Sequence, residues 1–159
     1  MSLTKKFTLL CADGSEHSER AFKWYFETAH HEGDEIGIVH VHCLPTLPGF
    51  GGDIIATDLY SQMINQSIED SKAVMEKFKE LCEGKGVTPK AFLVSMNESV
   101  GNTVCTVAKE NDVTLIVSGQ RGLGAFRRAI FGSVSDYILH HSEVPVVIVP
   151  PPIGHEKKE

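Results

Sequence analysis

Residues 35–43 read Glu-Ile-Gly-Ile-Val-His-Val-His-Cys, a short run that is apolar on both faces of an extended chain. Side chains alternate between the two faces of a strand, so Ile36 and Ile38 share one face. The other face carries Val39, Val41 and Cys43. A strand with two apolar faces is typical of a parallel sheet that helices cover on both sides. The run therefore predicts a buried strand of an α/β protein.

Four similar apolar runs lie before and after it along the chain, and they span residues 7–12, 90–96, 113–118 and 144–150. Between the runs, apolar residues recur at helical spacing. These helical segments cover residues 22–29, 64–82, 100–108 and 134–141, and Gly33 is the expected stop of the first helix. Five strands alternating with four helices predict a doubly wound, Rossmann-like α/β domain over residues 1–150, and we expect residues 151–159 to form a disordered tail. In such sheets, ligands bind beyond the carboxyl ends of the strands, where the winding direction reverses.

The charge balance narrows the classes of function. In 159 residues, 15 Lys and Arg stand against 21 Asp and Glu, which gives a formal charge of −6. An acidic chain argues against general binding to nucleic acid or to an anionic membrane, because both need a basic surface. No apolar run approaches the roughly 20 residues that span a bilayer, and the amino terminus lacks the apolar stretch of a signal peptide. We expect a cytoplasmic protein.

Cysteine and histidine spacing gives no metal signature. The four cysteines form no CxxC pair, which argues against structural zinc. We expect Cys11 and Cys43, which lie in strand-like runs, to be small buried apolar residues. His40 and His42 share one face of a strand, but zinc needs three or four ligands. We therefore expect no metal site.

A glycine-rich segment follows the fourth strand. Residues 119–135 hold four glycines, three of the four arginines in the chain and no acid. Arg121, Arg127 and Arg128 thus concentrate positive charge within an acidic protein, which indicates an anion site. Gly119 and Gly122 allow sharp turns and close approach to a ligand.

The end of this segment adds a helix start. Gly132 and Ser133 open a helix, whose first N–H groups point outward, and Ser135 adds a second hydroxyl. Together with the glycines and arginines, these groups predict a phosphate cradle. The alternative is structural: the glycines only form turns, Ser133 and Asp136 form a capping box, and the arginines form a solvated edge.

The spacing Gly119-x2-Gly122-x9-Gly132-Ser133 is that of G-x2-G-x9-G-S/T in the ATP-binding branch of the universal stress protein family, which the chain resembles over residues 5–150. The resemblance extends to Ala12-Asp13-Gly14-Ser15 and His40-Val41, and to the final apolar strand with its two prolines. It implies the strand order 3-2-1-4-5.

The resemblance also implies a ligand and its contacts. Ala12 and Asp13 would contact the adenosine portion of ATP, and the Val41 backbone would border the adenine. The phosphates would be held by Gly119, Gly122, Gly132, Ser133, Val134 and Ser135. From the local charge we add Arg121 to the phosphate site, and we expect Mg²⁺ on the phosphates. Family members dimerise through the last strand, so a homodimer through residues 144–149 is expected, and an unknown protein partner is compatible with it.

Three functions stay open on the sequence. The first is a nucleotide-binding regulatory or stress-response protein without a catalytic residue. The second is a slow, Mg²⁺-dependent ATP hydrolase or phosphotransferase; only Asp13 could act there as base or metal ligand, so we expect at most a weak ATPase. The third is a dimeric scaffold that binds a different nucleotide, such as AMP or a cyclic nucleotide.

Overall fold

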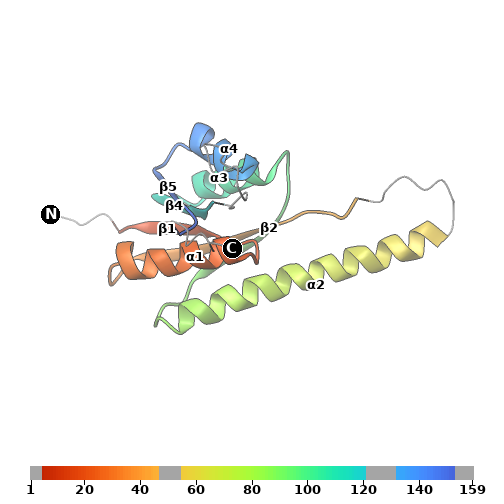
Figure 1. Cartoon of the computed structure of the whole chain (residues 1–159), viewed down its shortest axis with the longest axis horizontal. Helices are drawn as coiled ribbons and strands as arrows, with labels where there is room; N and C mark the ends of the chain where they lie inside the picture. The colour runs from red at the N-terminus through yellow and green to blue at the C-terminus, as the bar shows by residue number, and fades with distance from the viewer. Residues whose placement is uncertain (1–4, 47–54, 121–131, 153–159) are drawn as a thin grey trace, which may run out of the picture.

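The protein is a five-stranded parallel sheet between two layers of helices (Figure 1). The computed structural model describes residues 5–46, 55–120 and 132–152. The strands are β1 (Phe7–Cys11), β2 (Glu35–His42), β3 (Lys90–Ser95), β4 (Leu115–Gly119) and β5 (Val146–Val149). The helical elements are α1 (Glu16–Trp24), η1 (Tyr25–Ala29), α2 (Ile55–Glu83), α3 (Val100–Glu110) and α4 (Ser133–His141).

The strand order is β3-β2-β1-β4-β5, which confirms the order expected from the resemblance. β1 is central: Leu10 lies opposite Ile38 of β2 on one side and Val117 of β4 on the other. The chain winds outward from β1 to β3 and then returns to the other side of β1 for β4 and β5. The winding direction therefore reverses between β1 and β4, so the carboxyl ends of these two strands form the switch point.

Each face of the sheet has its own core. Phe22 and Phe78, from α1 and α2, pack on one face against Leu10 and Ile38. On the opposite face, Val104 of α3 and Ile138 of α4 pack against other strand residues, including Leu9, Val39 and Ile116. The double coverage explains why the strands are apolar on both faces.

The first helix ends differently from the prediction. Ser15 caps α1, with its side chain accepting a hydrogen bond from the Ser18 N–H. The expected stop at Gly33 is wrong, because the helical segment ends four residues earlier in the wider turn η1, where the His30 N–H donates to the Tyr25 carbonyl over 2.9 Å. Gly33 instead adopts a positive φ of 90° in the turn before β2.

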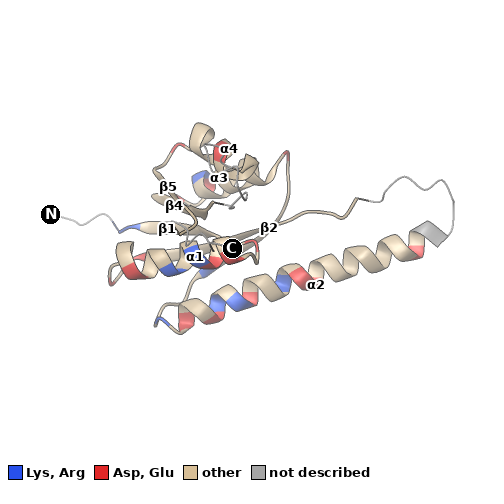
Figure 2. Ribbon diagram, in the orientation of Figure 1, with Lys and Arg blue, Asp and Glu red and all other residues tan. Residues whose placement is uncertain are grey.

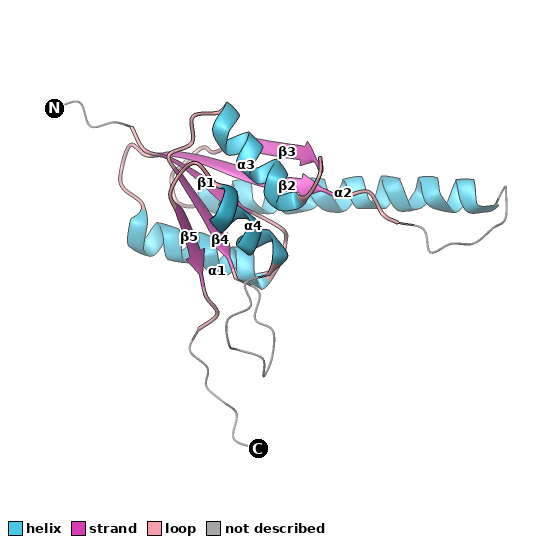
Figure 3. Cartoon of the chain, turned by 90° about the horizontal axis from the view of Figure 1, so that it is seen from above, coloured by secondary structure: helices cyan, strands magenta, loops and turns pink. Residues whose placement is uncertain are grey.

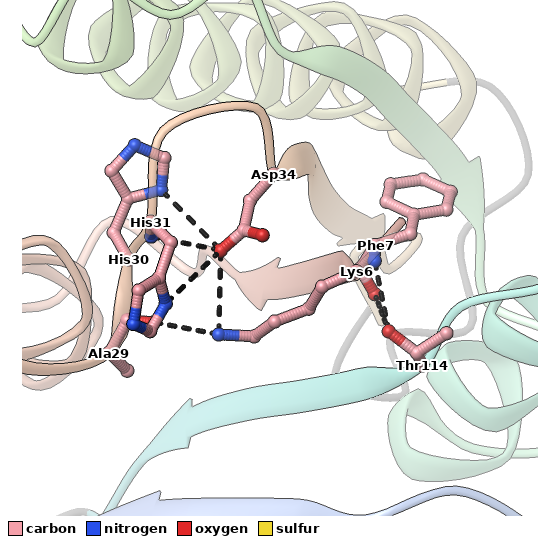
Figure 4. A network of polar contacts seen from close by, with 7 residues as sticks. All are labelled: Lys6, Phe7, Ala29, His30, His31, Asp34 and Thr114. Carbon is pink, nitrogen blue, oxygen red and sulfur yellow. Dashed lines mark hydrogen bonds and ion pairs between the residues drawn. The ribbon is translucent and has the colours of Figure 1, made fainter. Parts of the chain in front are cut away.

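A polar network holds that turn to the start of β1 (Figure 4). The Asp34 carboxylate accepts the His31 N–H at 2.9 Å and lies 3.5 Å from the Lys6 ammonium, which itself donates to the Ala29 carbonyl at 2.7 Å. Nearby, the Thr114 hydroxyl accepts the Phe7 N–H at 2.9 Å. These contacts lie at the amino-terminal edge of the sheet, opposite the switch point.

Helix α2 is the longest element, with 29 residues, and it extends past the end of the sheet (Figures 1 and 3). Met75, Phe78 and Cys82 in its second half are buried, as their helical spacing predicts. Charged residues gather in this second half and are sparse in the first (Figure 2). Among the described helices, none is both long and apolar enough to cross a membrane.

Candidate functional site

A cavity of about 520 Å³ opens at the switch point, over the carboxyl ends of β1, β2 and β4. Its floor comes from the ends of these strands, and its sides come from the first turns of α3 and α4. The lining residues are Cys11, Ala12, Asp13, Ser18, Val39, His40, Val41, Cys43, Val100, Val104, Ser118, Gly119, Gly132, Ser133, Val134 and Ser135. Parallel-sheet proteins bind their ligands in this position.

The cavity brings together most of the residues that the sequence singled out. From the first two strands come Ala12, Asp13 and Val41, and Gly119 comes from β4. The first turn of α4 contributes residues 132–135. Arg121, Gly122, Arg127 and Arg128 lie outside the described residues.

The turn after β1 is held by its own side chains. The Asp13 carboxylate accepts hydrogen bonds from the N–H of Ser15, at 2.9 Å, and from the Ser15 hydroxyl. Gly14 has a φ of 78°, and a Cβ added there would lie 2.8 Å from Val74 of α2. Asp13 therefore has the turn role that local chemistry predicts, and it also lines the cavity.

The start of α4 excludes one structural alternative. The N-cap is Gly132, whose carbonyl accepts the Asp136 N–H at 2.9 Å. Ser133 is then the first helical residue rather than the cap, so the capping box expected of Ser133 and Asp136 is not formed. The first N–H groups of α4, at the positive end of its dipole, lie at the cavity wall. This end of the cavity suits an anion.

Gly119 is required for a reason that its spacing does not reveal. A Cβ there would lie 2.1 Å from the carbonyl oxygen of His17, in the first turn of α1. Close packing of β4 against α1 is therefore enough to require glycine at position 119. The expected reason, close approach to a ligand, is not needed to explain it. At Gly132, by contrast, a Cβ would meet no described atom within 4 Å.

Part of the cavity lining is apolar. Val39 and Val41 of β2 and Val100 and Val104 of α3 all line the cavity. Such a wall can accept a flat, apolar ring.

Two cysteines also line the cavity, and they differ in exposure. Cys11 is half-buried rather than buried, and desolvation raises the pKa of its thiol to about 12, so that the thiol is unreactive. Cys43 is exposed just past the end of β2, and the prediction that it is buried is wrong. The alternating pattern ran one residue beyond the strand, which ends at His42.

Sequence reasoning missed the polar residues that back the cavity. Ser18 and Ser118 are buried, and His40 contacts both β1 and α2. The histidine pair on β2 was visible, but its partners were not: the His40 ring meets Ser71, and the His42 ring meets Ser67 at 3.0 Å. Among the described side chains, no group of three or more His, Cys, Asp and Glu is placed to hold a metal ion.

Comparison with known proteins identifies relatives along nearly the whole chain. The model of the universal stress protein family matches residues 7–150. Universal stress protein YxiE of Bacillus subtilis is 28% identical over 144 residues, which span 89% of this chain and 96% of that protein.

Solved structures share the fold. A universal stress protein family protein from Arabidopsis thaliana with AMP bound has a TM-score of 0.62 and 18% identity, and the match covers 93% of both chains. A universal stress protein in complex with cAMP has a TM-score of 0.63 and 20% identity, over 91% of this chain and 96% of that one. The protein described here belongs to the universal stress protein family.

Proposed function

We propose that this protein binds an adenine nucleotide, ATP with Mg²⁺, in the cavity at the switch point and acts as a cytoplasmic regulatory protein of the stress response. The observation that carries the proposal is the mixed lining of the cavity. Its apolar residues on β2 and α3 suit a purine ring, and the first turn of α4, which also lines it, suits an anion.

Each end of the ligand then has its own contacts. Val41 borders the adenine, Ala12 and Asp13 contact the ribose, and residues 132–135 hold the phosphates together with Gly119. Arg121 and Gly122 complete the phosphate site in this proposal. Mg²⁺ enters on the phosphates.

Turnover is expected to be slow. Asp13 is engaged in the turn after β1, and the His40 ring is engaged by Ala12 and Ser71. Neither group is thereby poised to orient an attacking water molecule. Binding, rather than hydrolysis, is therefore the activity that we assign.

A nucleoside monophosphate is the second candidate ligand. Relatives with bound AMP and in complex with cAMP favour it. Arg121, Arg127 and Arg128 favour the triphosphate, because their charge acts most strongly on the more highly charged ligand. A comparison of ATP, AMP and cAMP affinities by titration calorimetry decides between them.

We further infer a homodimer through residues 144–149. β5 is an edge strand of the sheet, and its side chains are apolar. An exposed apolar edge favours pairing with a second copy of the strand.

The decisive test is Gly132→Val. Gly132 lines the cavity, and a Cβ at this position would meet no described atom within 4 Å, so we expect the fold to be kept while the added side chain hinders phosphate binding. For the wild type, ATP at a hundredfold excess over Kd should stabilise the protein by about 2.7 kcal/mol, seen as a rise in Tm. The variant should show the wild-type Tm without ATP and no rise with it. A normal rise in the variant would refute the phosphate assignment.

A further inference from the structure

His40, near the end of β2, lines the cavity but has no role in the proposed function. Both nitrogens of its ring are engaged by other parts of the chain. Its Nδ1 lies 2.7 Å from the carbonyl oxygen of Ala12, at the end of β1. Its Nε2 lies 3.1 Å from the hydroxyl of Ser71, a buried residue of α2. The ring therefore joins the central strand to the helix that covers it.

The partners indicate which tautomer the neutral ring adopts. A carbonyl oxygen only accepts hydrogen bonds, so Nδ1 carries the proton and donates to Ala12. In the neutral ring Nε2 is then an acceptor, and the Ser71 hydroxyl donates to it. Ser71 thus orients the ring, and the ring in turn orients the carbonyl of Ala12.

That carbonyl belongs to the peptide unit that precedes the Asp13 Cα. The N–H of the same unit donates to the Ser18 hydroxyl, at 3.4 Å. Because a peptide unit is planar, contacts to both its oxygen and its nitrogen fix its orientation. The Ala12 N–H, which donates to the Val39 carbonyl at 2.9 Å, fixes the preceding unit as well. The backbone that presents Asp13 is thereby held on both sides.

We propose that His40 is a positioning residue of the nucleotide site: through the Ala12 carbonyl it sets the orientation of Asp13 toward the ligand, and Ser71 of α2 keeps the ring in place. The proposal rests on the proposed function, since Asp13 is assigned there to the ribose.

His42 offers a matched control. It lies two residues further along the same face of β2, and its Nε2 makes a similar contact to Ser67, one turn of α2 away from Ser71. Yet His42 is not part of the cavity lining. If His40 only joined β2 to α2, replacing it should change the ATP affinity as little as replacing His42. If His40 positions Asp13, replacing it should weaken ATP binding.

Two substitutions at His40 separate its two contacts. Asn places an amide N–H near the position of Nδ1, so His40→Asn keeps the Ala12 contact and loses Ser71. Gln reaches the position of Nε2, so His40→Gln keeps Ser71 and loses Ala12. His42→Asn removes the Ser67 contact.

The test is ATP affinity by titration calorimetry, with Tm measured in parallel. We expect His40→Gln to weaken ATP binding about tenfold, the equivalent of one hydrogen bond. His42→Asn should bind within about twofold to threefold of the wild type, whatever its Tm. His40→Asn, which keeps the Ala12 contact but loses Ser71, should lose less ATP affinity than His40→Gln.

A double-mutant cycle completes the test. If His40 acts through Asp13, His40→Gln should cost almost nothing in a protein that already carries Asp13→Ala. Additive losses would overturn the proposal, as would equal affinities of the His40→Gln and His40→Asn variants. A wild-type protein that binds no adenine nucleotide would instead overturn the proposed function, and this inference with it.

Discussion

At the scale of single residues, two glycines with the same spacing signature have different physical roles. A Cβ at Gly119 would lie 2.1 Å from the His17 carbonyl oxygen, whereas one at Gly132 would meet no described atom within 4 Å. Gly119→Ala should therefore lower the free energy of unfolding by about 1–3 kcal/mol, the range for overpacking, while Gly132→Ala should change it by less than about 0.5 kcal/mol. Urea denaturation at equal m-values measures both. Equal stabilities of the two variants would contradict the contact between β4 and α1.

The two glycines also show which residue roles local sequence can predict and which it cannot. Glycine spacing and local charge singled out Gly119 and Gly132, which both line the cavity. They did not reveal why Gly119 must be glycine, because His17 lies about a hundred residues away along the chain. His40 is the converse case. Its position on a strand was evident, but its contacts to Ala12 and Ser71 depend on three segments that only the folded sheet brings together.

At the scale of elements, serines at two helix starts have contrasting roles. The Ser99 side chain caps α3 by accepting the Asn102 N–H at 3.1 Å, whereas Ser133 follows the cap of α4 and makes no capping bond. Ser99→Ala should cost about 0.5–2 kcal/mol of stability and leave the ATP affinity near that of the wild type. Ser133→Ala should do the reverse, with almost full stability and weaker ATP binding. Chemical denaturation and calorimetry on both variants check this; a stability loss at Ser133 would restore the capping-box alternative.

Most elements were predictable because each apolar run is short and ends at a turn signal. The exceptions have local causes. The bond from the His30 N–H to the Tyr25 carbonyl ends the first helical segment in a wide turn that a 3.6-residue period does not indicate. β4 begins at Leu115 rather than at 113, and β5 covers four residues, Val146–Val149, rather than the seven of residues 144–150. Val113, before β4, is buried, whereas Pro145 and Pro150, on either side of β5, are exposed. An apolar run can therefore continue past the end of a strand whether or not its last residues are buried.

At the scale of the whole molecule, the edge strand β5 presents backbone groups to which a second copy of the chain could bond. β5 bonds to β4 through the carbonyls of Pro145 and Val149, which accept the N–H groups of Ile116 and Gln120 at 3.0 and 2.9 Å. Backbone groups alternate in direction along a strand, so those of Val146 and Ile148 point away from β4. These outward groups are the ones that a partner strand would use.

Ile148→Pro therefore tests the dimer without removing a bond to β4. Proline is tolerated on an edge strand, but it lacks the N–H that would pair with the second copy. We expect the variant to be a folded monomer in sedimentation velocity experiments, while the wild type and the conservative Ile148→Val variant sediment as dimers. Circular dichroism verifies that the proline variant is folded. A folded Ile148→Pro protein that still sediments as a dimer would place the interface elsewhere, and a monomeric wild type would remove the dimer altogether.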